Sequence, residues 1–460
     1  MYEIDFNTPC HVYFVGIGGI SMSGLAELLL HEGFTVSGSD WKSSALTQAL
    51  EKKGITVSYG ESAAHITRDI DCAILTSAVR DTNLEFQAIR ELGIPWLSRA
   101  QLLGQLMKNY KVSVAVSGTH GKTTTTSMIS EILLRAGTDP TLAIGGIMKS
   151  IGTNIRIGGG QYFVAEACEY TDSFLSLFPT IGVILNIGED HLDYFKDIRH
   201  IRASFRKFAE LIPAEGCLII NADIPEYEEI TAGLPCRIIT YSTEGNPADY
   251  FPDHISYDNL GHPSFVLHGP NGGVSSFTLQ VPGLHNVSNA LAAIALADWL
   301  AVERTVTSDA LAAFSGTARR FEYKGSVGGV TIIDDYAHHP TEITATLSAA
   351  KKYPKERLWC VFQPHTYSRT KALLKDFAQA LSLADKVVLA DIYAARETDT
   401  LGVSSRTLQE EIQKLGHECY YFPSFDEIEN FLLENCINGD LLITMGAGDV
   451  LKIGESLLGQ

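Results

Sequence analysis

The sequence predicts an α/β protein of three domains in series. The chain has 460 residues, whereas a typical domain has about 150. Short apolar runs that resemble buried strands alternate with helical segments, which is the pattern of parallel sheets covered by helices. Hydrophobic residues make up 45% of the chain, which is enough for several cores. We place the domains at residues 1–109, 110–315 and 316–460.

The composition excludes several classes of protein. Lys and Arg total 35 against 54 Asp and Glu, so the net charge is −19. A chain this acidic is a poor non-specific ligand for nucleic acid or anionic membranes. Residues 1–5 lack the basic start and apolar stretch of a signal peptide, and no apolar run approaches the roughly 20 residues that span a bilayer, so we expect neither a leader nor a membrane span. Its eight cysteines form no C-x-x-C pair, which argues against a zinc site or a disulfide framework. We expect a cytoplasmic protein that binds neither nucleic acid nor membrane.

The first domain begins with an apolar run at residues 11–15, which predicts a buried strand. Glycines follow it, and then a helical stretch with Leu25, Leu28 and Leu29 on one face. Further strands are predicted at residues 34–36 and 73–75. This alternation predicts a parallel, doubly wound sheet.

The other two domains repeat the pattern. In the second domain, strands are predicted at residues 112–116, 162–165, 181–185 and 217–220. Hairpins are predicted in the polar, glycine-rich stretch 244–275, and a helix begins near His285. In the third domain, strands are predicted at residues 330–333, 358–362, 386–389 and 441–444.

The strongest motif follows the strand at 112–116 and reads VSGTHGKTT over residues 116–124. Backbone N–H groups at such a helix start cradle phosphates. Lys122 would reach the β and γ oxygens, and the Thr123 hydroxyl would help hold Mg²⁺. Val116 stands where the common P-loop pattern has its first glycine. The alternative is a glycine turn with an incidental lysine, which the strand–turn–helix context disfavours.

A second glycine loop, GIGGIS over residues 16–21, follows the first strand, and Asp40 comes after the next one. Read alone, this pattern predicts a Rossmann dinucleotide site, although Ser21 replaces the third glycine. The same loop would also bind another pyrophosphate, such as that of a nucleotide sugar. A plain strand-to-helix turn is the third reading, and the residues leave all three open.

Candidate metal ligands and base-binding amides follow the phosphate loop. Glu166 directly follows the strand predicted at 162–165 and offers the hard oxygen that Mg²⁺ prefers. His191 follows another strand and is either a metal ligand or a residue that stabilises its loop. Asn286 and Asn289, one helical turn apart, would read the edge of a base, or Asn286 would cap the helix.

The third domain carries titratable groups at a strand end. Asp335 and His338 follow the apolar strand at 330–333, and the pair Arg319-Arg320 precedes it. Because histidine titrates near neutral pH, acid–base chemistry is a reasonable expectation there. The alternative readings are a polar loop and a solvated pair of arginines.

These motifs together resemble the Mur ligase family. From residue 16 to residue 449 they read GIGGISMSG, GSD, SGTHGKTTTT, EACEY, NIGEDH, GLHNVSNA, RRF, DDYAHHP, FQPHTYSRT and MGAGD. Their order and spacing are far more specific than any one of them. The resemblance implies a Rossmann-like N-terminal domain, a central P-loop ATPase-type domain with a mostly parallel sheet, and a Rossmann-like C-terminal domain that binds the amino acid and closes over the cleft.

The resemblance also implies an activity. This is the ligation of L-alanine to the carboxylate of UDP-N-acetylmuramate through an acyl phosphate, with ATP as co-substrate, in cytoplasmic synthesis of the peptidoglycan precursor. Mg²⁺, or alternatively Mn²⁺, would assist, and no NAD would be used. The partners would be these small molecules, and the protein would be a monomer or a homodimer. The rival readings are a family member that adds a peptide in murein recycling, an NAD-dependent oxidoreductase, and a non-catalytic nucleotide-binding module.

Matching positions carry the family's roles onto this chain. The catalytic residues implied are Lys122, Glu166, His191, Arg320, Asp335 and His338. The ATP-binding residues implied are Gly118, Thr119, His120, Gly121, Lys122, Thr123, Thr124, His285, Asn286, Asn289, Arg320 and Asp335. The UDP-sugar site implied comprises Gly16, Gly18, Gly19, Ile20, Ser21 and Asp40. The amino acid would be held by Tyr336, His365 and Arg369, and the metal by Thr123, Glu166 and His191.

Some positions depart from the family's pattern. Cys168 and Tyr170 stand where many relatives have an acidic residue and a serine, which puts a role for these positions in doubt, while Glu166 and Glu169 remain. Thr366 stands where many relatives have arginine, so one expected cation near the amino acid is missing.

Overall fold

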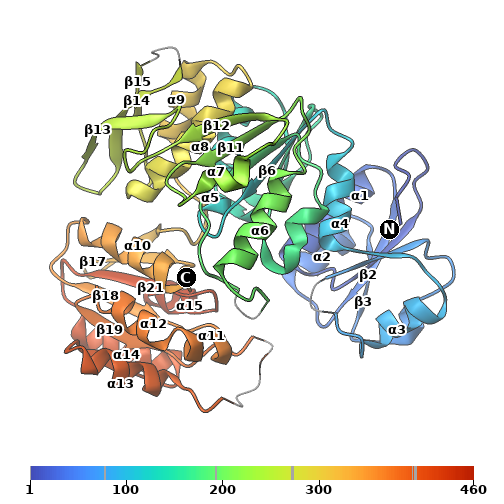
Figure 1. Ribbon diagram of the computed structural model, residues 1–460. Helices are drawn as coiled ribbons and strands as arrows, with labels where there is room; N and C mark the ends of the chain where they lie inside the picture. The colour runs from blue at the N-terminus through green and yellow to red at the C-terminus, as the bar shows by residue number, and fades with distance from the viewer. Residues whose placement is uncertain (1, 77–78, 192–193, 271–273, 396, 398–400) are drawn as a thin grey trace. The chain divides into compact units, whose positions relative to one another are not determined.

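The computed structural model describes residues 2–76, 79–191, 194–270, 274–395, 397 and 401–460. The chain forms two compact units, Met1–Phe251 with Asn289–Ala310, and Pro252–Ser288 with Leu311–Gln460. Figure 1 shows strands and helices along the whole chain, so the predicted α/β class is confirmed. None of the helices in the described ranges is long and apolar enough to cross a bilayer. The predicted domain boundaries stay a prediction.

The first sheet has five parallel strands in the order β3-β2-β1-β4-β5. β1 is central, and its side chains are buried on both faces, with Val12 and Phe14 on one face and Tyr13 and Val15 on the other. The strand order reverses at β1, so the loop after it lies at a switch point, where ligands bind in such sheets. The elements are β1 (His11–Val15), α1 (Ile20–His31), β2 (Thr35–Asp40), α2 (Ala45–Lys52), β3 (Thr56–Tyr59), η1 (Ala63–His65), β4 (Cys72–Leu75), α3 (Leu84–Glu91), β5 (Trp96–Ser98) and α4 (Arg99–Met107).

The second sheet has seven strands in the order β12-β11-β10-β6-β9-β7-β8, and only the β7–β8 pair is antiparallel. β6 lies between β9 and β10, where the order reverses. The ends of these three strands therefore meet at one edge. The elements are β6 (Val112–Ser117), α5 (Lys122–Arg135), β7 (Thr141–Met148), β8 (Thr153–Arg156), β9 (Tyr162–Glu166), η2 (Tyr170–Ser176), β10 (Ile181–Ile184), α6 (Ile198–Ala209), β11 (Cys217–Asn221), α7 (Tyr227–Thr231) and β12 (Arg237–Tyr241).

The predicted hairpins form a small third sheet in the order β13-β14-β15. β14 and β15 pair antiparallel, with Phe265 opposite Phe277. The helix predicted near His285 begins one residue earlier. The elements are β13 (Phe251–Tyr257), β14 (Pro263–His268), β15 (Val274–Thr278), α8 (Leu284–Trp299) and α9 (Arg304–Ala313).

The fourth sheet has six strands in the order β16-β17-β21-β18-β19-β20, and β16 is its antiparallel edge. β21 lies between β17 and β18, with Met445 paired to both Asp335 and Phe362. The loops after these three strands therefore start at one level. The elements are β16 (Glu322–Val327), β17 (Val330–Asp335), α10 (Pro340–Lys351), β18 (Leu358–Phe362), α11 (Tyr367–Ala372), α12 (Leu374–Leu381), β19 (Lys386–Leu389), α13 (Ser405–Lys414), β20 (Cys419–Tyr421), α14 (Phe425–Asn435), β21 (Leu441–Met445) and α15 (Leu451–Leu457).

Candidate functional site

The phosphate loop joins β6 to α5. Gly121 is the N-cap of α5 with a φ of +85°, a conformation that favours glycine. The loop is fastened to the segment after β10, because the His120 N–H donates to Asn186 Oδ1 at 2.8 Å and Asn186 Nδ2 donates to the His120 carbonyl at 2.9 Å. The first N–H groups of α5 therefore stand ready for an anion at the carboxyl edge of the sheet.

Lys122 is the first residue of α5, and its ammonium group is bound within the loop. Nζ donates to the carbonyls of Gly118 and Thr119 at 2.6 and 3.0 Å and to Glu169 Oε2 at 2.9 Å. Burial alone would lower the pKa of Lys122, but the negative charges around it, that of Glu169 the largest, together with the Glu169 hydrogen bond hold that pKa above its usual value. The lysine is therefore fully charged at neutral pH.

Thr123 and Glu166 form a pair of oxygen donors beside the lysine. The Thr123 hydroxyl donates to Glu166 Oε2 at 2.8 Å, and the Gly145 N–H donates to the same oxygen at 2.9 Å. A hydroxyl next to a carboxylate is a donor set that suits Mg²⁺. Within the described ranges, no group of three or more His, Cys, Asp or Glu side chains is arranged to hold a metal by itself.

His191, the third predicted metal ligand, lies on the Glu169 side of the loop. Its Nε2 is 3.8 Å from Glu169 Oε1, and its ring centroid is 4.5 Å from that of Tyr170. Its φ of +54° is a left-handed conformation that is uncommon for a residue with a side chain. The backbone there is shaped so that the imidazole faces these two residues, a cost of the kind found at functional sites.

The two predicted amides of α8 differ in their surroundings. Asn289 is buried against the phosphate loop, because a Cβ added at Gly121 would lie 2.6 Å from its Oδ1. Asn286 lies inside the first turn and donates from Nδ2 to the Pro282 carbonyl at 2.7 Å. His285 is exposed on the same turn.

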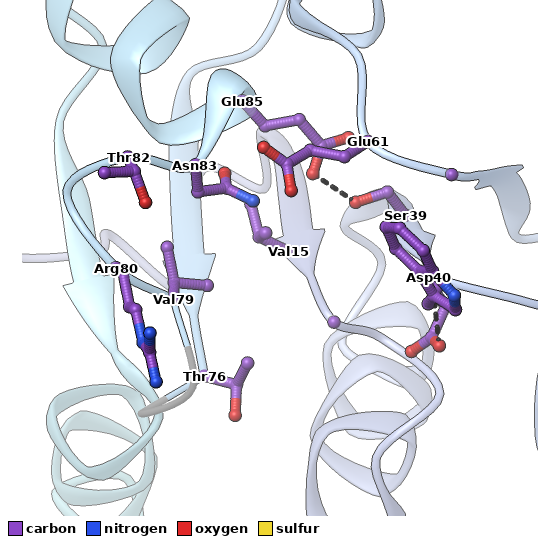
Figure 2. Close-up of a pocket in the computed structure, with 13 residues that line it drawn as sticks. Val15, Ser39, Asp40, Glu61, Thr76, Val79, Arg80, Thr82, Asn83 and Glu85 are labelled. Carbon is purple, nitrogen blue, oxygen red and sulfur yellow. Dashed lines mark hydrogen bonds between the residues drawn. The ribbon is translucent and has the colours of Figure 1, made fainter. Parts of the chain in front are cut away.

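The loop after β1 borders a cavity of about 320 Å³ in the first sheet (Figure 2). Gly16 and Asp40 line it, together with the exposed Trp41. Asp40 Oδ2 accepts the Gly18 N–H at 2.8 Å, so the acidic residue also shapes the glycine loop. The other predicted sugar-site residues lie beside the cavity, at the start of α1. Gly19 is the N-cap, Ile20 is the first helical residue, and Ser21 Oγ accepts from Arg99 at 3.1 Å.

Sequence reasoning missed the carboxylate that organises this cavity. Glu85 lines the cavity with a side chain only 2% exposed. It accepts from the Tyr13 hydroxyl at 3.1 Å and from Ser39 Oγ at 2.7 Å, and it lies 2.7 Å from His65 Nδ1. Figure 2 shows the Glu85–Ser39 bond at the cavity wall. In the sequence, Glu85 looks like an ordinary acidic residue in a first helical turn, so no local signal marks it.

In the fourth sheet, Asp335 lies at the end of β17 and is 5% exposed. Its two oxygens accept the N–H groups of Phe321 and Ala337, each at 2.7 Å. Burial raises the pKa of Asp335 to about 6, and the positive charge of Arg320 opposes that shift. The carboxyl group is thus ionised at neutral pH but close to titration.

The two arginines of the RRF motif have different roles. Arg319 donates to Asp334 Oδ2 at 2.9 Å and to two carbonyls after β21, those of Gly446 at 2.6 Å and Gly448 at 3.0 Å. It ties strand ends together. The Arg320 guanidinium lies 5.3 Å from the ring centroid of Tyr336. Arg320 therefore takes no part in the contacts that Arg319 makes with these carbonyls.

Glu342 is a second carboxylate that the sequence analysis missed. Its Oε1 lies 3.7 Å from Arg320 Nη1, and its Oε2 accepts the His338 N–H at 3.0 Å and lies 3.3 Å from His338 Nδ1. It is the N3 residue of the capping box that begins α10. The sequence His339-Pro340-Thr341-Glu342 carries this signal, since proline at N1 and glutamate at N3 are typical of a helix start.

His338 and His365 lie together over the strand ends, with ring centroids 5.9 Å apart. Burial lowers the pKa of His338. Burial, together with His338 and Arg369, lowers the pKa of His365 to about 4. His365 Nδ1 is buried and has no hydrogen-bond partner among the described residues. Both imidazoles are therefore neutral at pH 7, and one buried ring nitrogen is open to a ligand.

The structure thus brings the predicted residues together in three groups. The first is Lys122, Thr123 and Glu166 with Asn289 and His191 nearby. The second is Gly16 and Asp40 at the cavity. The third is Arg320, Asp335, Tyr336, His338 and His365. Arg369 on α11 belongs to this group, because its positive charge helps to lower the pKa of both histidines.

Comparisons with known proteins cover the whole chain. The profiles "Mur ligase family, catalytic domain", "Mur ligase middle domain" and "Mur ligase, glutamate ligase domain" match residues 11–111, 116–297 and 319–448. A UDP-N-acetylmuramate–L-alanine ligase of Agathobacter rectalis is 59% identical over 458 residues, 100% of both chains. One from Caldanaerobacter subterraneus is 50% identical over 456 residues, 99% of each chain.

Two solved structures have the same fold. A UDP-N-acetylmuramate–alanine ligase of Thermotoga maritima matches with a TM-score of 0.82 at 30% identity, over 98% of both chains. A murein peptide ligase of Psychrobacter arcticus matches with a TM-score of 0.74 at 28% identity, also over 98% of both. The resemblance read from the motifs is confirmed, and the chain belongs to the Mur ligase family.

Proposed function

We propose that this chain joins L-alanine to the lactyl carboxylate of UDP-N-acetylmuramate with hydrolysis of ATP to ADP and phosphate. The carboxylate attacks the γ-phosphorus and ADP leaves, which gives an acyl phosphate. The alanine amine then attacks the acyl carbon, loses a proton, and inorganic phosphate leaves. The observation that carries the proposal is the charged Lys122 at the start of α5, beside the Thr123–Glu166 pair, in a chain whose relatives of 50 to 59% identity bear this ligase name.

The ATP site of the proposal is the phosphate loop. Lys122 and the first N–H groups of α5 neutralise the phosphates as charge moves from the γ-phosphate to ADP. His285, Asn286 and Asn289 contact the nucleoside, and the family resemblance assigns Arg320 and Asp335 to ATP as well. Mg²⁺, or Mn²⁺ in its place, would be held by Thr123, Glu166 and His191 and would screen the phosphate charge.

The amine acceptor chemistry of the proposal falls to the fourth sheet. An attacking amine has to be neutral, so a base that is itself neutral at pH 7 is required. His338 meets this requirement, because burial lowers its pKa, and the Glu342 carboxylate orients its ring. Tyr336, His365 and Arg369 hold the alanine, with Arg369 on its carboxylate. Closure over the site would keep water from the acyl phosphate.

The UDP part of the sugar substrate is assigned to the cavity of the first sheet. The start of α1 offers the N–H groups of Ile20 and Ser21 to the pyrophosphate. Gly18 and Gly19 shape the loop, because their own N–H groups donate to Asp40 Oδ2 and to the Gly16 carbonyl. Gly16 and Asp40 line the cavity itself. A nucleotide sugar is favoured here over NAD, because the relatives named above act on UDP-N-acetylmuramate. A peptide in place of alanine, as in murein recycling, is not favoured by the same relatives.

The test is phosphate release from Mg-ATP with UDP-N-acetylmuramate, with and without L-alanine, followed by mass spectrometry. Release that requires both substrates, with a product heavier by one alanyl residue, supports the proposal. Release only when a tripeptide replaces alanine would move the chain to the recycling activity. Glycine should react more slowly than alanine by about 10- to 100-fold, because one methyl group is worth about 1–3 kcal/mol.

A further inference from the structure

We propose that Glu169 is a positioning residue that holds the Lys122 ammonium group in the nucleotide-free protein and yields it to a nucleotide phosphate. This inference rests on the proposed function, since it assumes that Lys122 binds ATP. None of the roles assigned above uses Glu169. Its carboxylate is nonetheless among the most buried acidic groups in the chain, with a side chain only 3% exposed.

The geometry indicates a counter-ion rather than a distant neighbour. Lys122 Nζ lies 2.9 Å from Glu169 Oε2 and 3.3 Å from Oε1, so the ammonium faces both oxygens. The other oxygen donor set of the site is separate, because Glu166 is bound to Thr123 and to the Gly145 N–H. The two carboxylates therefore do different work. Glu166 accepts a hydrogen bond from the Thr123 hydroxyl, and Glu169 accepts one from the Lys122 ammonium group.

The ammonium group has no spare donor in this state. A lysine has three N–H bonds, and those of Lys122 are used by the Gly118 carbonyl, the Thr119 carbonyl and Glu169. A phosphate oxygen can approach Lys122 only if one of these acceptors is released. The two carbonyls belong to the loop that wraps the phosphates, so the carboxylate is the partner to be exchanged.

The exchange has an energetic consequence. A carboxylate and a phosphate are both anions that compete for one cation, and charge-assisted hydrogen bonds are about twice as strong as neutral ones. Glu169 thus keeps the buried lysine paired before ATP arrives, which avoids the cost of an isolated buried charge. It also weakens the binding of the nucleotide by the energy of the pair that must be broken.

The experiment measures binding of a non-hydrolysable ATP analogue to the full-length protein by calorimetry, at fixed Mg²⁺. Glu169→Gln keeps the size of the side chain and removes its charge, so we expect binding to tighten by about tenfold, the loss of one charge-assisted bond. In a Lys122→Met background the same substitution should change affinity by less than about twofold. Glu189→Gln, an exposed carboxylate on the neighbouring loop, is the matched control and should leave affinity unchanged.

The outcomes separate this inference from the proposed function. If Lys122→Met alone leaves analogue binding unchanged, the proposed nucleotide site fails. If Lys122→Met weakens binding but Glu169→Gln does not tighten it, or tightens it equally in the Lys122→Met background, only the role of Glu169 is overturned. Should Glu169→Gln not fold, Glu169→Asp withdraws the carboxylate from Nζ and is expected to tighten binding by about threefold; unchanged or weaker binding would contradict the inference.

Discussion

The phosphate loop after β6 and the cluster of titratable side chains after β17 both follow the carboxyl end of a strand, but they consist of different chemical groups. Both lie at the carboxyl ends of parallel strands. The first consists of backbone N–H groups and one lysine that stays charged. The second consists of Asp335, His338 and His365. Burial raises the pKa of Asp335 and lowers the pKa of both histidines, so it favours the neutral form of each group.

The difference shows what each region is suited to do. A permanently charged loop neutralises phosphate charge at any physiological pH. Groups held neutral or near titration can take up or release a proton. A ligase needs both, because it must transfer a phosphoryl group and then accept an amine. The comparison therefore predicts that variants of the two regions fail in different steps.

The largest effect is expected from Lys122→Ala. Loss of the Lys122 ammonium group, which binds within the phosphate loop, should slow phosphate release by at least about 1,000-fold, because phosphoryl transfer depends on charge neutralisation. The measurement is single-turnover phosphate release. Activity within about tenfold of the natural protein would show that the lysine is not needed for phosphoryl transfer. It would contradict the role given to the phosphate loop.

His338→Ala tests the other side. Alanine ligation should slow by about 100-fold or more, as expected for the loss of a general base, while binding of UDP-N-acetylmuramate is unchanged. Hydroxylamine, which attacks acyl phosphates without help from a base, should still give the hydroxamate at near the natural rate. Equal losses with alanine and hydroxylamine would show that His338 acts before the amine step, and unchanged ligation would exclude it.

Asp335→Asn tests the buried charge. Because the pKa is about 6 when folded against 3.8 in the unfolded chain, the penalty is absent below pH 3.8 and complete above about pH 6. The natural protein should therefore lose stability relative to the Asn variant as pH rises from 4 to 7, by about 2 to 3 kcal/mol. Urea unfolding at both pH values measures this. A difference between the two proteins that does not change with pH would contradict the raised pKa.

The smallest effect is expected at Tyr170, whose ring contacts His191. Tyr170→Ser should weaken Mn²⁺ binding, followed by electron paramagnetic resonance with an ATP analogue present, by about two- to tenfold, the value of one aromatic contact. Tyr170→Phe keeps the ring and should bind Mn²⁺ like the natural protein. If the Phe and Ser variants weaken equally, the ring contact does not position the histidine.

Much of the fold was accessible from the sequence because the central strands are continuous apolar runs. The predicted runs at 11–15 and 358–362 are β1 and β18 with the same bounds. The edge strands of the sheets were not predicted. β16, for example, contains Lys324 and Gly325 and is half exposed, so its pattern resembles a loop. Edge strands bury one face at most, and the sequence signal falls with burial.

The candidate site divides in the same way. Local sequence patterns predict the roles of Lys122 and Asp335. Lys122 follows a glycine loop at the start of a helix, and Asp335 is one of two acidic residues after an apolar strand. Glu85, Glu169 and Glu342 act through partners distant in the sequence or through a helix cap, so only the folded chain displays their contacts. Residues that support a site are set by tertiary contacts, and single-sequence patterns rarely identify them.

The most direct test of the central claim follows the carboxylate oxygen of the sugar substrate. UDP-N-acetylmuramate labelled with ¹⁸O in its carboxylate is incubated with Mg-ATP and L-alanine, and the products are analysed by mass spectrometry. Attack on the γ-phosphorus predicts that one ¹⁸O appears in inorganic phosphate for each amide formed, with ADP unlabelled. Label in AMP, or amide formation without transfer of label to phosphate, would contradict the account.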